Sequence, residues 1–265
     1  QYREVKQAHP DCLVMLRMGD FYEMFYQDAV TASRELEITL TARGTGEKRA
    51  PLAGVPFHAL ETYLGRLVKK GYKVAIVEQL EDPKKTKKLV KRGLVRIVTP
   101  GTVMESTLLN EKENNYVLAL TVQGEEYTVA FCDLSTGEFF TNSVSGTASL
   151  FSEINRYTPS ECLIPVSLKV NQELLKSIQS TGCFLTSLED ELFSLPKASE
   201  LLRTQFFPQA VEVFGLQQHP SAIAVSGALL KYLMDTQKTA LSHIKCITLR
   251  TNQHRMLLDS STFRN

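Results

Sequence analysis

Several patterns that would assign this chain to a familiar class are missing from it. It has no run of about 18 apolar residues and no charged-then-apolar leader, so we expect neither a membrane span nor a secretory signal. It also has no Gly-x-x-x-x-Gly-Lys-Ser/Thr loop to hold a nucleotide phosphate. The five cysteines stand singly and the five histidines are dispersed, which disfavours a disulfide framework and a zinc site. We therefore expect reduced, mostly buried thiols.

The composition is that of a folded protein with a charge asymmetry. Its 265 residues, 43% hydrophobic and 22% charged, suffice for two domains. The net charge of +1 conceals a difference between regions, because residues 1–100 hold 18 Lys and Arg against 12 Asp and Glu, whereas residues 101–265 hold 12 against 17. Their net charges are therefore +6 and −5. We expect only the first region to approach a polyanion.

The segment Met18–Phe25, with the sequence MGDFYEMF, is the most informative stretch of the chain. It follows an apolar block that is short enough for a buried strand. Gly19 interrupts that strand, as glycine does at a bulge or where another backbone comes close. If the chain stays extended past Gly19, Phe21 and Glu23 point to one face and Tyr22 to the other, because strand side chains alternate.

An aromatic ring beside a carboxylate is suited to contact with DNA. A ring can wedge between stacked bases, and a carboxyl group can hydrogen-bond the edge of the adjacent base. The alternative is that Phe21 and Phe25 are core residues and that Glu23 lies at a solvated edge, since aromatic side chains are often simply buried.

The segment RMGDFYEMF resembles the start of the MutS family of DNA mismatch repair proteins, whose mismatch-recognition domain carries a Phe-x-Glu motif in this context. Other segments resemble the family's in order and at similar spacing: Pro51–Ala59, Val74–Gln79, Val95–Thr102, Asp235–Lys238 and Asp259–Asn265. The resemblance covers nearly the whole chain and is weakest between about residues 143 and 214.

The resemblance implies mismatched-DNA binding in mismatch repair. Phe21 would stack against the mispaired base from the minor groove of a kinked duplex, and Glu23 would hydrogen-bond that base. Unstacking and bending cost least where pairing is already faulty, so deformability contributes to discrimination. Phosphates repel a carboxylate, and we therefore expect a raised pKa for Glu23, which would let its protonated carboxyl donate to a base acceptor.

Charge alone predicts further contacts with the DNA backbone. Clusters of basic residues occupy the loop 43–49 and the strip 84–92, and another arginine lies in an apolar segment. The candidates are Arg43, Lys48, Arg49, Lys84, Lys85, Lys87, Lys88 and Arg96. Their phosphate contacts would be independent of sequence and sensitive to salt. For the strip 84–92, a solvated surface without a ligand is an equal alternative.

We predict an α/β (α+β) fold with two domains. A small mixed-sheet mismatch-recognition domain is expected over residues 1–101, a linker over 102–115, a connector domain over 116–247, and the incomplete start of a core or lever domain over 248–265. The first domain should have helices over 2–9, 27–36 and 58–70, and strands that include 37–42. In the connector, three strand-like runs precede alternating helices and strands, which fits the RNase H-like sheet implied by the resemblance.

A metal-dependent nuclease is the alternative function. Carboxylates on an RNase H-like sheet can bind two metal ions for phosphodiester hydrolysis. Asp133 ends a predicted strand, and Glu138 and Glu153 are the other candidates, but they lack a convincing third member. An aspartate before Ser135-Thr136-Gly137 is more often a turn former.

The resemblance also implies partners and a location. Double-stranded DNA with mismatches or small loops is the expected ligand, and MutL is the expected partner of the connector. The full-length protein is expected to be a homodimer, and this chain alone, which begins with Gln1, a monomeric fragment. ATP and Mg²⁺ are expected only for an ATPase domain outside this sequence, so we expect no cofactor, no metal site and no enzymatic activity here. The expected location is the cytoplasm, at the nucleoid when bound to DNA.

Overall fold

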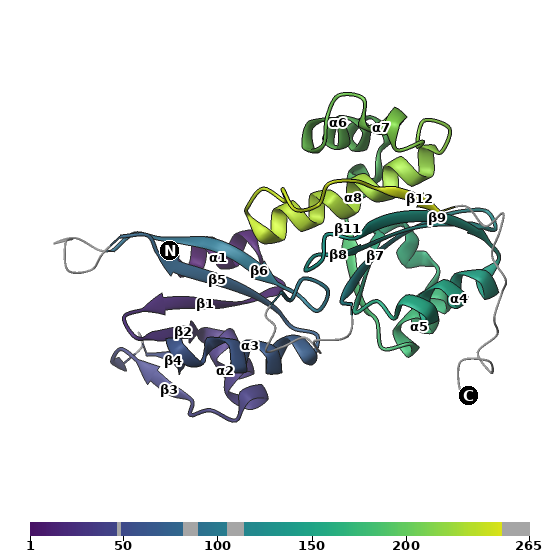
Figure 1. The fold of residues 1–265 in the computed structure, drawn as a ribbon. Helices are drawn as coiled ribbons and strands as arrows, with labels where there is room; N and C mark the ends of the chain where they lie inside the picture. Colours follow the sequence, from purple (N-terminus) through teal and green to yellow (C-terminus); the bar gives the residue numbers. More distant parts are fainter. Residues whose placement is uncertain (47–48, 82–89, 105–113, 251–265) are drawn as a thin grey trace. The chain divides into compact units, whose positions relative to one another are not determined.

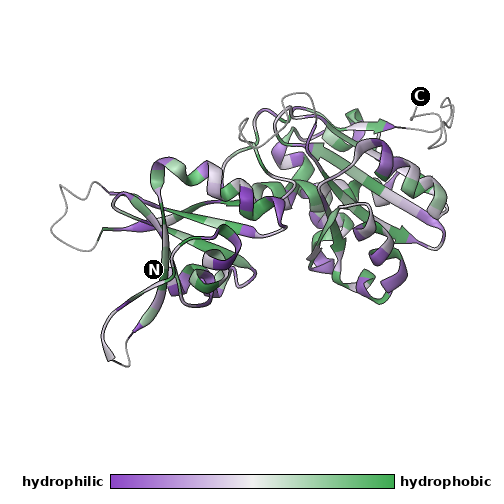
Figure 2. Cartoon of the chain, turned by 90° about the horizontal axis from the view of Figure 1, so that it is seen from below, coloured by the Kyte–Doolittle hydropathy of each residue, from purple (hydrophilic) through white to green (hydrophobic). Residues whose placement is uncertain are grey.

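A computed structural model describes residues 1–46, 49–81, 90–104 and 114–250 (Figure 1). The chain divides into two compact units. The first comprises Gln1–Glu113 with Asp235–Thr239, and the second comprises Asn114–Met234 with Ala240–Asn265. In each unit the sheet strands are largely hydrophobic, and hydrophilic residues gather on outer helix faces and connections (Figure 2). The pattern is that of two separate cores.

The first unit is built on a six-stranded mixed sheet. Its elements are α1 (Tyr2–Ala8), β1 (Cys12–Met18), β2 (Phe21–Phe25), α2 (Tyr26–Leu36), β3 (Thr41–Arg43), β4 (Ala50–Pro56), η2 (Phe57–Ala59), α3 (Leu60–Lys69), β5 (Lys73–Gln79) and β6 (Arg92–Val98). The strand order is β3-β4-β2-β1-β5-β6. Strand β1 runs parallel to β5, and the other neighbours are antiparallel.

The central strand β1 is covered on both faces, which explains its continuous apolar run. Leu13 and Met15 belong to a core cluster with residues of α2 and α3. Cys12, Val14 and Leu16 belong to a second cluster, against which side chains of α1 pack. The predicted helices over 2–9, 27–36 and 58–70 are thus found close to their expected positions.

Gly19 is part of a two-residue hairpin turn. Met18 pairs with Phe21, so Gly19 and Asp20 form the connection between β1 and β2. Gly19 has a φ of 61°, which a type II′ turn requires at its first central position. A Cβ atom built on Gly19 would meet nothing within 4 Å. The expectation of a bulge or a close backbone approach is therefore wrong, and the glycine serves the backbone conformation of a turn.

The strand predicted over residues 37–42 is also displaced. Glu37 caps α2 in the left-handed conformation, with a φ of 59°, so the chain turns there and β3 begins only at Thr41. Strand β4 was not predicted, because Pro51, Gly54 and Pro56 are residue types that are depleted in strands. It nevertheless pairs with both β2 and β3.

The second unit contains another six-stranded mixed sheet. Its elements are β7 (Tyr116–Gln123), β8 (Glu126–Asp133), β9 (Phe139–Ser145), α4 (Thr147–Tyr157), β10 (Glu161–Pro165), η3 (Val166–Val170), α5 (Gln172–Ser180), β11 (Phe184–Leu188), η4 (Asp190–Phe193), α6 (Leu195–Gln205), α7 (Ala210–Val213), α8 (Pro220–Gln237) and β12 (Thr248–Arg250). The strand order is β11-β10-β7-β8-β9-β12.

This topology is the one expected for the connector. Strands β7, β8 and β9 form an antiparallel meander, and β10 and β11 add in parallel beside β7. One core cluster joins the sheet to α6, α7 and α8, and another joins it to α4 and α5. Strand β12 pairs with β9, so the sheet extends past residue 247, the expected end of the domain.

Candidate nucleic-acid interface

Phe21 and Glu23 lie side by side on one face of β2. The neighbouring positions Tyr22 and Met24 point into the core and are 3% and 0% exposed. Phe21 is 47% exposed, and the Glu23 side chain is 21% exposed. The predicted facing of this strand is therefore confirmed, and the alternative that Phe21 is a core residue is wrong. Phe25 is partly buried, with its ring centroid 5.3 Å from that of Tyr2.

Tyr22 anchors the strand from the opposite face. Its hydroxyl donates a hydrogen bond to Glu78 on β5. Burial, aided by this contact with a carboxylate, raises the pKa of Tyr22 to about 12. The phenol is therefore neutral at physiological pH and acts as a hydrogen-bond donor. This contact ties β2 to the centre of the sheet and directs the Phe21 ring outward.

Glu23 has a cationic partner in the unbound chain. Arg43 Nη1 lies 3.3 Å from Glu23 Oε2 and 3.8 Å from the Met18 sulfur. Arg43 belongs to β3, and in the strand order β4 separates it from β2, so its side chain reaches over β4. Arg43, predicted from charge as a phosphate contact, thus already belongs to the same site as Glu23.

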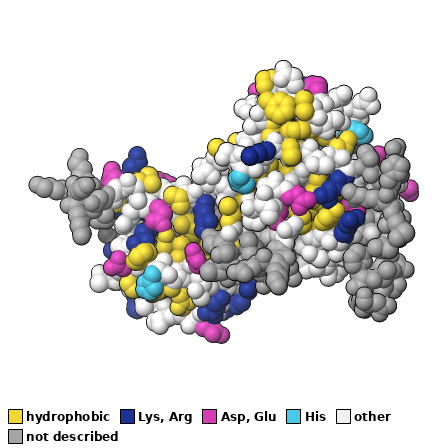
Figure 3. All heavy atoms as spheres, viewed as in Figure 1, with side chains coloured by type: hydrophobic (Ala, Val, Ile, Leu, Met, Phe, Trp, Pro, Cys, Tyr) yellow, Lys and Arg dark blue, Asp and Glu magenta, His cyan; other side chains and the backbone are white. Residues whose placement is uncertain are grey.

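A shallow hollow of about 530 Å³ opens beside this pair. Its lining combines one exposed ring, carboxylates, hydroxyls and apolar side chains: Phe21, Glu23, Glu37, Ile38, Thr39, Thr41, Leu52 and Gly54. On the face of the first unit that Figure 3 shows, cationic and anionic side chains are interspersed with apolar ones. Groups able to stack on a planar ligand and to hydrogen-bond its edge therefore meet in the hollow.

A second exposed aromatic residue lies near the hairpin turn. Phe57 is 44% exposed, and the guanidinium carbon of Arg17 lies 4.0 Å from its ring centroid. The Phe57 backbone N–H donates to the Asp20 carbonyl at 2.9 Å, which fixes η2 against the turn. Arg17 pairs with Tyr22 and therefore lies on the sheet face opposite Phe21. Sequence reasoning missed its contact with Phe57, because only the pairing of β1 with β2 and of β2 with β4 brings the two together.

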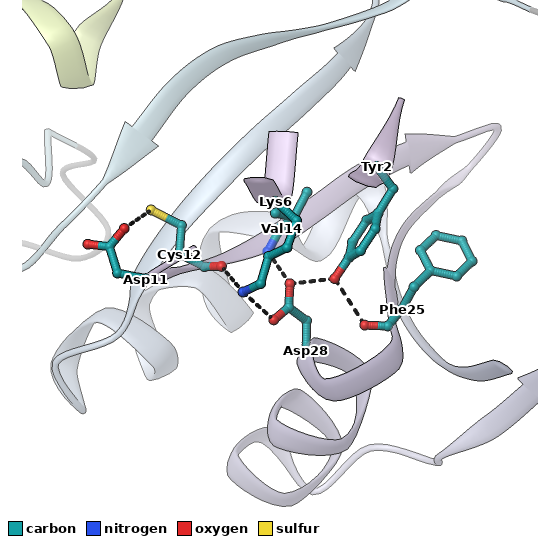
Figure 4. Close-up of polar contacts among 7 residues, drawn as sticks. All are labelled: Tyr2, Lys6, Asp11, Cys12, Val14, Phe25 and Asp28. Atoms are coloured by element: carbon teal, nitrogen blue, oxygen red, sulfur yellow. Dashed lines mark hydrogen bonds and ion pairs between the residues drawn. The ribbon is translucent and has the colours of Figure 1, made fainter. Parts of the chain in front are cut away.

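A buried carboxylate holds the junction between β2 and α2 (Figure 4). Asp28 is 2% exposed. Its Oδ2 accepts hydrogen bonds from the Tyr2 hydroxyl at 2.5 Å and from the Val14 N–H at 3.0 Å. Its Oδ1 is 2.8 Å from the Lys6 ammonium. A buried charge with this many donors is compensated rather than costly.

The position of Asp28 has a consequence for β2. The pairing of β1 with β2 ends at Leu16 and Glu23, so at Val14 the Asp28 carboxylate replaces the missing strand partner. Tyr2 also donates to the Phe25 carbonyl at 3.0 Å, and its burial raises the pKa of its phenol far above the ordinary value. The chain can therefore leave the sheet directly after Phe25 without unsatisfied backbone groups.

The three predicted backbone-binding residues that the structure describes lie apart in the first unit. Arg43 lies beside Glu23, whereas the backbone N–H of Arg49 donates to the Gly46 carbonyl in the β3–β4 connection. Arg96 lies on β6, three strands from β2, which corresponds to about 14 Å across the sheet. The other candidates, Lys48, Lys84, Lys85, Lys87 and Lys88, lie outside the described residues.

The nuclease alternative has no support in the second unit. Among residues 1–46, 49–81, 90–104 and 114–250, no group of three or more His, Cys, Asp or Glu side chains could hold a metal ion. Asp133 Oδ1 accepts from the Ser135 N–H at 2.8 Å and the Ser135 hydroxyl at 2.7 Å, as a turn former does. Glu138 accepts from Tyr116 and Arg250, and Glu153 lies within the α4 packing.

Most of the cysteine thiols are buried, as their spacing in the sequence predicts. Cys12, Cys132, Cys162 and Cys183 are buried and free, and Cys246 is exposed. Burial raises the pKa of Cys12 and Cys183 to about 12, so these two thiols stay protonated and unreactive at neutral pH. Of the helices that the structure describes, none combines the length and apolar character needed to cross a membrane.

These features define a two-unit α/β protein whose first unit presents an aromatic ring and a carboxylate together on an exposed sheet face. Two family models match it: MutS domain I over residues 1–107 and MutS domain II over residues 115–245. The chain belongs to the MutS family.

Curated relatives match the chain over its whole length. The DNA mismatch repair protein MutS of Methanosarcina acetivorans is 46% identical over 282 residues, that of Ruminiclostridium cellulolyticum 43% over 270, and that of Clostridium tetani 43% over 268. In each case all of this chain is covered, but only 31%, 31% and 29% of the relative. The chain thus spans about a third of the length of these relatives.

Proposed function

We propose that this chain binds mismatched DNA in DNA mismatch repair. The observation that carries the proposal is the exposed Phe21 ring beside Glu23 on one strand face, in a chain of the MutS family. The names of its relatives, DNA mismatch repair proteins, point in the same direction.

The mechanism follows from the chemistry of the pair. The Phe21 ring enters the minor groove and occupies a base step that a mispaired or unpaired base has already weakened, and Glu23 hydrogen-bonds that base. A well-paired step resists unstacking, so the cost of deformation separates faulty from matched DNA. The carboxylate acts as a hydrogen-bond acceptor toward base donors, and as a donor only when protonated.

Arg43 reduces the electrostatic repulsion between the Glu23 carboxylate and the DNA phosphates. In the unbound chain its guanidinium lies 3.3 Å from the Glu23 carboxylate and screens its charge. When DNA arrives, Arg43 can turn to a phosphate while Glu23 turns to the base. We propose that Arg49, Arg96, Lys48, Lys84, Lys85, Lys87 and Lys88 add phosphate contacts that hold the kinked backbone without reading sequence.

The remaining assignments belong to the same proposal. The second unit would dock MutL, and homodimerisation and ATP hydrolysis with Mg²⁺ would belong to the full-length protein and not to these residues. We propose no cofactor and no catalytic residue for this chain. Its location would be the cytoplasm, at the nucleoid when bound to DNA.

The test is competition binding of Phe21→Ala to a duplex with a G·T pair or a single unpaired base and to its matched duplex, at stated salt. We expect the mismatch preference to collapse toward the non-specific level while matched binding and melting temperature change little. Tyr22→Ala is the matched control from the opposite face, and it should lower stability more than discrimination. Retained preference in folded Phe21→Ala would show that the wedge lies elsewhere.

A further inference from the structure

Gly54 occupies a position in β4 at which glycine is costly. It lies opposite Glu23 in the register, on the face that carries Phe21 and Glu23. A glycine inside a strand loses more backbone entropy on folding than other residues and packs no side chain. A strand glycine is explained when the backbone needs a positive φ or when a neighbouring group leaves no room for a Cβ atom.

Neither explanation applies to Gly54. It is not among the glycines with positive φ, unlike Gly19. A Cβ atom built on it would lie 3.5 Å from the Tyr22 carbonyl oxygen, 3.7 Å from Phe21 Cδ1 and 3.8 Å from Glu23 Cγ, which are ordinary van der Waals distances. Gly227 on α8 differs, because its Cβ would lie 2.4 Å from that of Ala198.

The space that Gly54 leaves open is adjacent to the proposed base-reading groups. Two of the three nearest atoms to its virtual Cβ belong to the side chains of Phe21 and Glu23. Gly54 also lines the hollow of about 530 Å³, together with Leu52 and Thr41 on the same face of β4 and β3. Any side chain at position 54 would project between the ring and the carboxylate.

We propose that Gly54 is a specificity-determining residue: its missing side chain keeps open the gap between the Phe21 ring and the Glu23 carboxylate that receives the edge of a mispaired or unpaired base. This inference rests on the proposed function. The ligand is the planar edge of a nucleobase, which stacks on Phe21 and hydrogen-bonds Glu23. Gly54 costs the strand backbone entropy, and the gap that it leaves would be filled only when DNA is bound.

The test introduces bulk at position 54 without disturbing the backbone. Gly54→Ala and Gly54→Val are introduced into a full-length protein, one as long as the curated relatives. Ala50→Val in the same protein is the control. Ala50 lies four residues away on the same face of β4, opposite Arg43 in the register and outside the hollow. Affinities for a duplex with one unpaired base and for its matched duplex are measured at the same salt, and melting temperatures are recorded.

We expect Gly54→Val to reduce the preference for the unpaired base by roughly tenfold, the effect of a methylene misfit in a complementary site, and Gly54→Ala to reduce it by less. The affinity of both variants for matched DNA should stay within about twofold of that of the unaltered protein, since phosphate contacts are unchanged. Melting temperatures should hold or rise, because alanine and β-branched residues suit a strand better than glycine. If Gly54→Val lowers the melting temperature, the mismatch preference of Gly54→Ala is the result that tests the proposal.

Three results would overturn the inference, and they are distinguishable. Unchanged preference in both Gly54 variants, with discrimination by the unaltered protein, would refute the role of Gly54 and leave the proposed function standing. An equal loss in Ala50→Val would assign the effect to Arg43 or to the sheet as a whole, and not to the gap at Gly54. Absence of discrimination in the unaltered protein would refute the proposed function itself.

Discussion

Both units place an arginine over an aromatic ring and pair an arginine with a glutamate, yet the rings are used differently. In the second unit the Arg250 guanidinium carbon lies 3.3 Å from the centroid of the Phe140 ring, and its Nη2 donates to Glu138 at 2.7 Å. Phe140 is 0% exposed and stacks on Phe131 with centroids 5.1 Å apart. Here the arginine closes a buried aromatic cluster.

In the first unit the same residue types remain open to solvent. Arg17 lies over Phe57 at 4.0 Å, and Arg43 pairs with Glu23 at 3.3 Å. Phe57 and Phe21 nevertheless stay 44% and 47% exposed. Residue type alone therefore does not distinguish a buried aromatic cluster from aromatic rings that are exposed to solvent. The difference is the covering layer.

The largest expected difference is in the cost of deleting a ring. Phe140→Ala should destabilise the second unit by about 3–5 kcal/mol, because it leaves a cavity in the core. Phe21→Ala should cost the first unit only about 1 kcal/mol or less, since half of its surface is already in water. Hydrogen exchange measured peptide by peptide assigns each loss to its own unit. Equal losses would remove the distinction between the two aromatic sites.

Removal of the buried support under the exposed site should have the next largest effect. Asp28→Ala leaves the Val14 N–H without an acceptor and Lys6 without its counter-ion, and should cost about 2–3 kcal/mol. Faster exchange should appear in β1 and at the β2–α2 junction. Asp28→Asn is the control, because its amide oxygen can still accept from Val14, and it should lose less. Equal losses in the two variants would argue against this account of the network.

The closing arginine of the second unit should contribute less than the ring beneath it. Arg250→Ala should cost about 1–2 kcal/mol, the sum of a cation–π contact and a partly exposed ion pair. Arg250→Lys should recover little of this, because an ammonium cannot stack flat on Phe140. Denaturation midpoints measured for the two variants test this, and full recovery by lysine would show that charge alone matters.

The smallest effect concerns Glu35 of the first unit, as a counterpart to the Glu138 pair of the second. Hydrogen bonds from Lys70, Arg34 and Tyr72 lower the pKa of Glu35 to about 2, from an ordinary value of 4.5. Because the folded-state pKa is depressed, the stabilisation is present above about pH 4.5 and is lost as the pH falls toward 2. Melting temperatures of Glu35→Gln and the unaltered chain should converge over this window. A constant difference would exclude the linkage.

Local sequence patterns were sufficient for most elements of the fold. The periodic helix ending before Gly71, whose φ is 86°, was found as α3, and the meander of β7, β8 and β9 matched its turn signals. Strand β4 escaped prediction, because its prolines and glycine hide a strand that pairs on both sides. The hairpin at Gly19 was misassigned, since a glycine within an apolar run does not distinguish a turn from a bulge.

The sequence by itself determined the alternation of β2, and with it the side-by-side placement of Phe21 and Glu23, because a strand repeats every two residues whatever surrounds it. Only the tertiary structure decided which face of β2 is buried, that Arg43 reaches Glu23 over β4, and that Gly54 lies opposite Glu23. These facts depend on pairing between segments about 30 residues apart, which local periodicity does not encode.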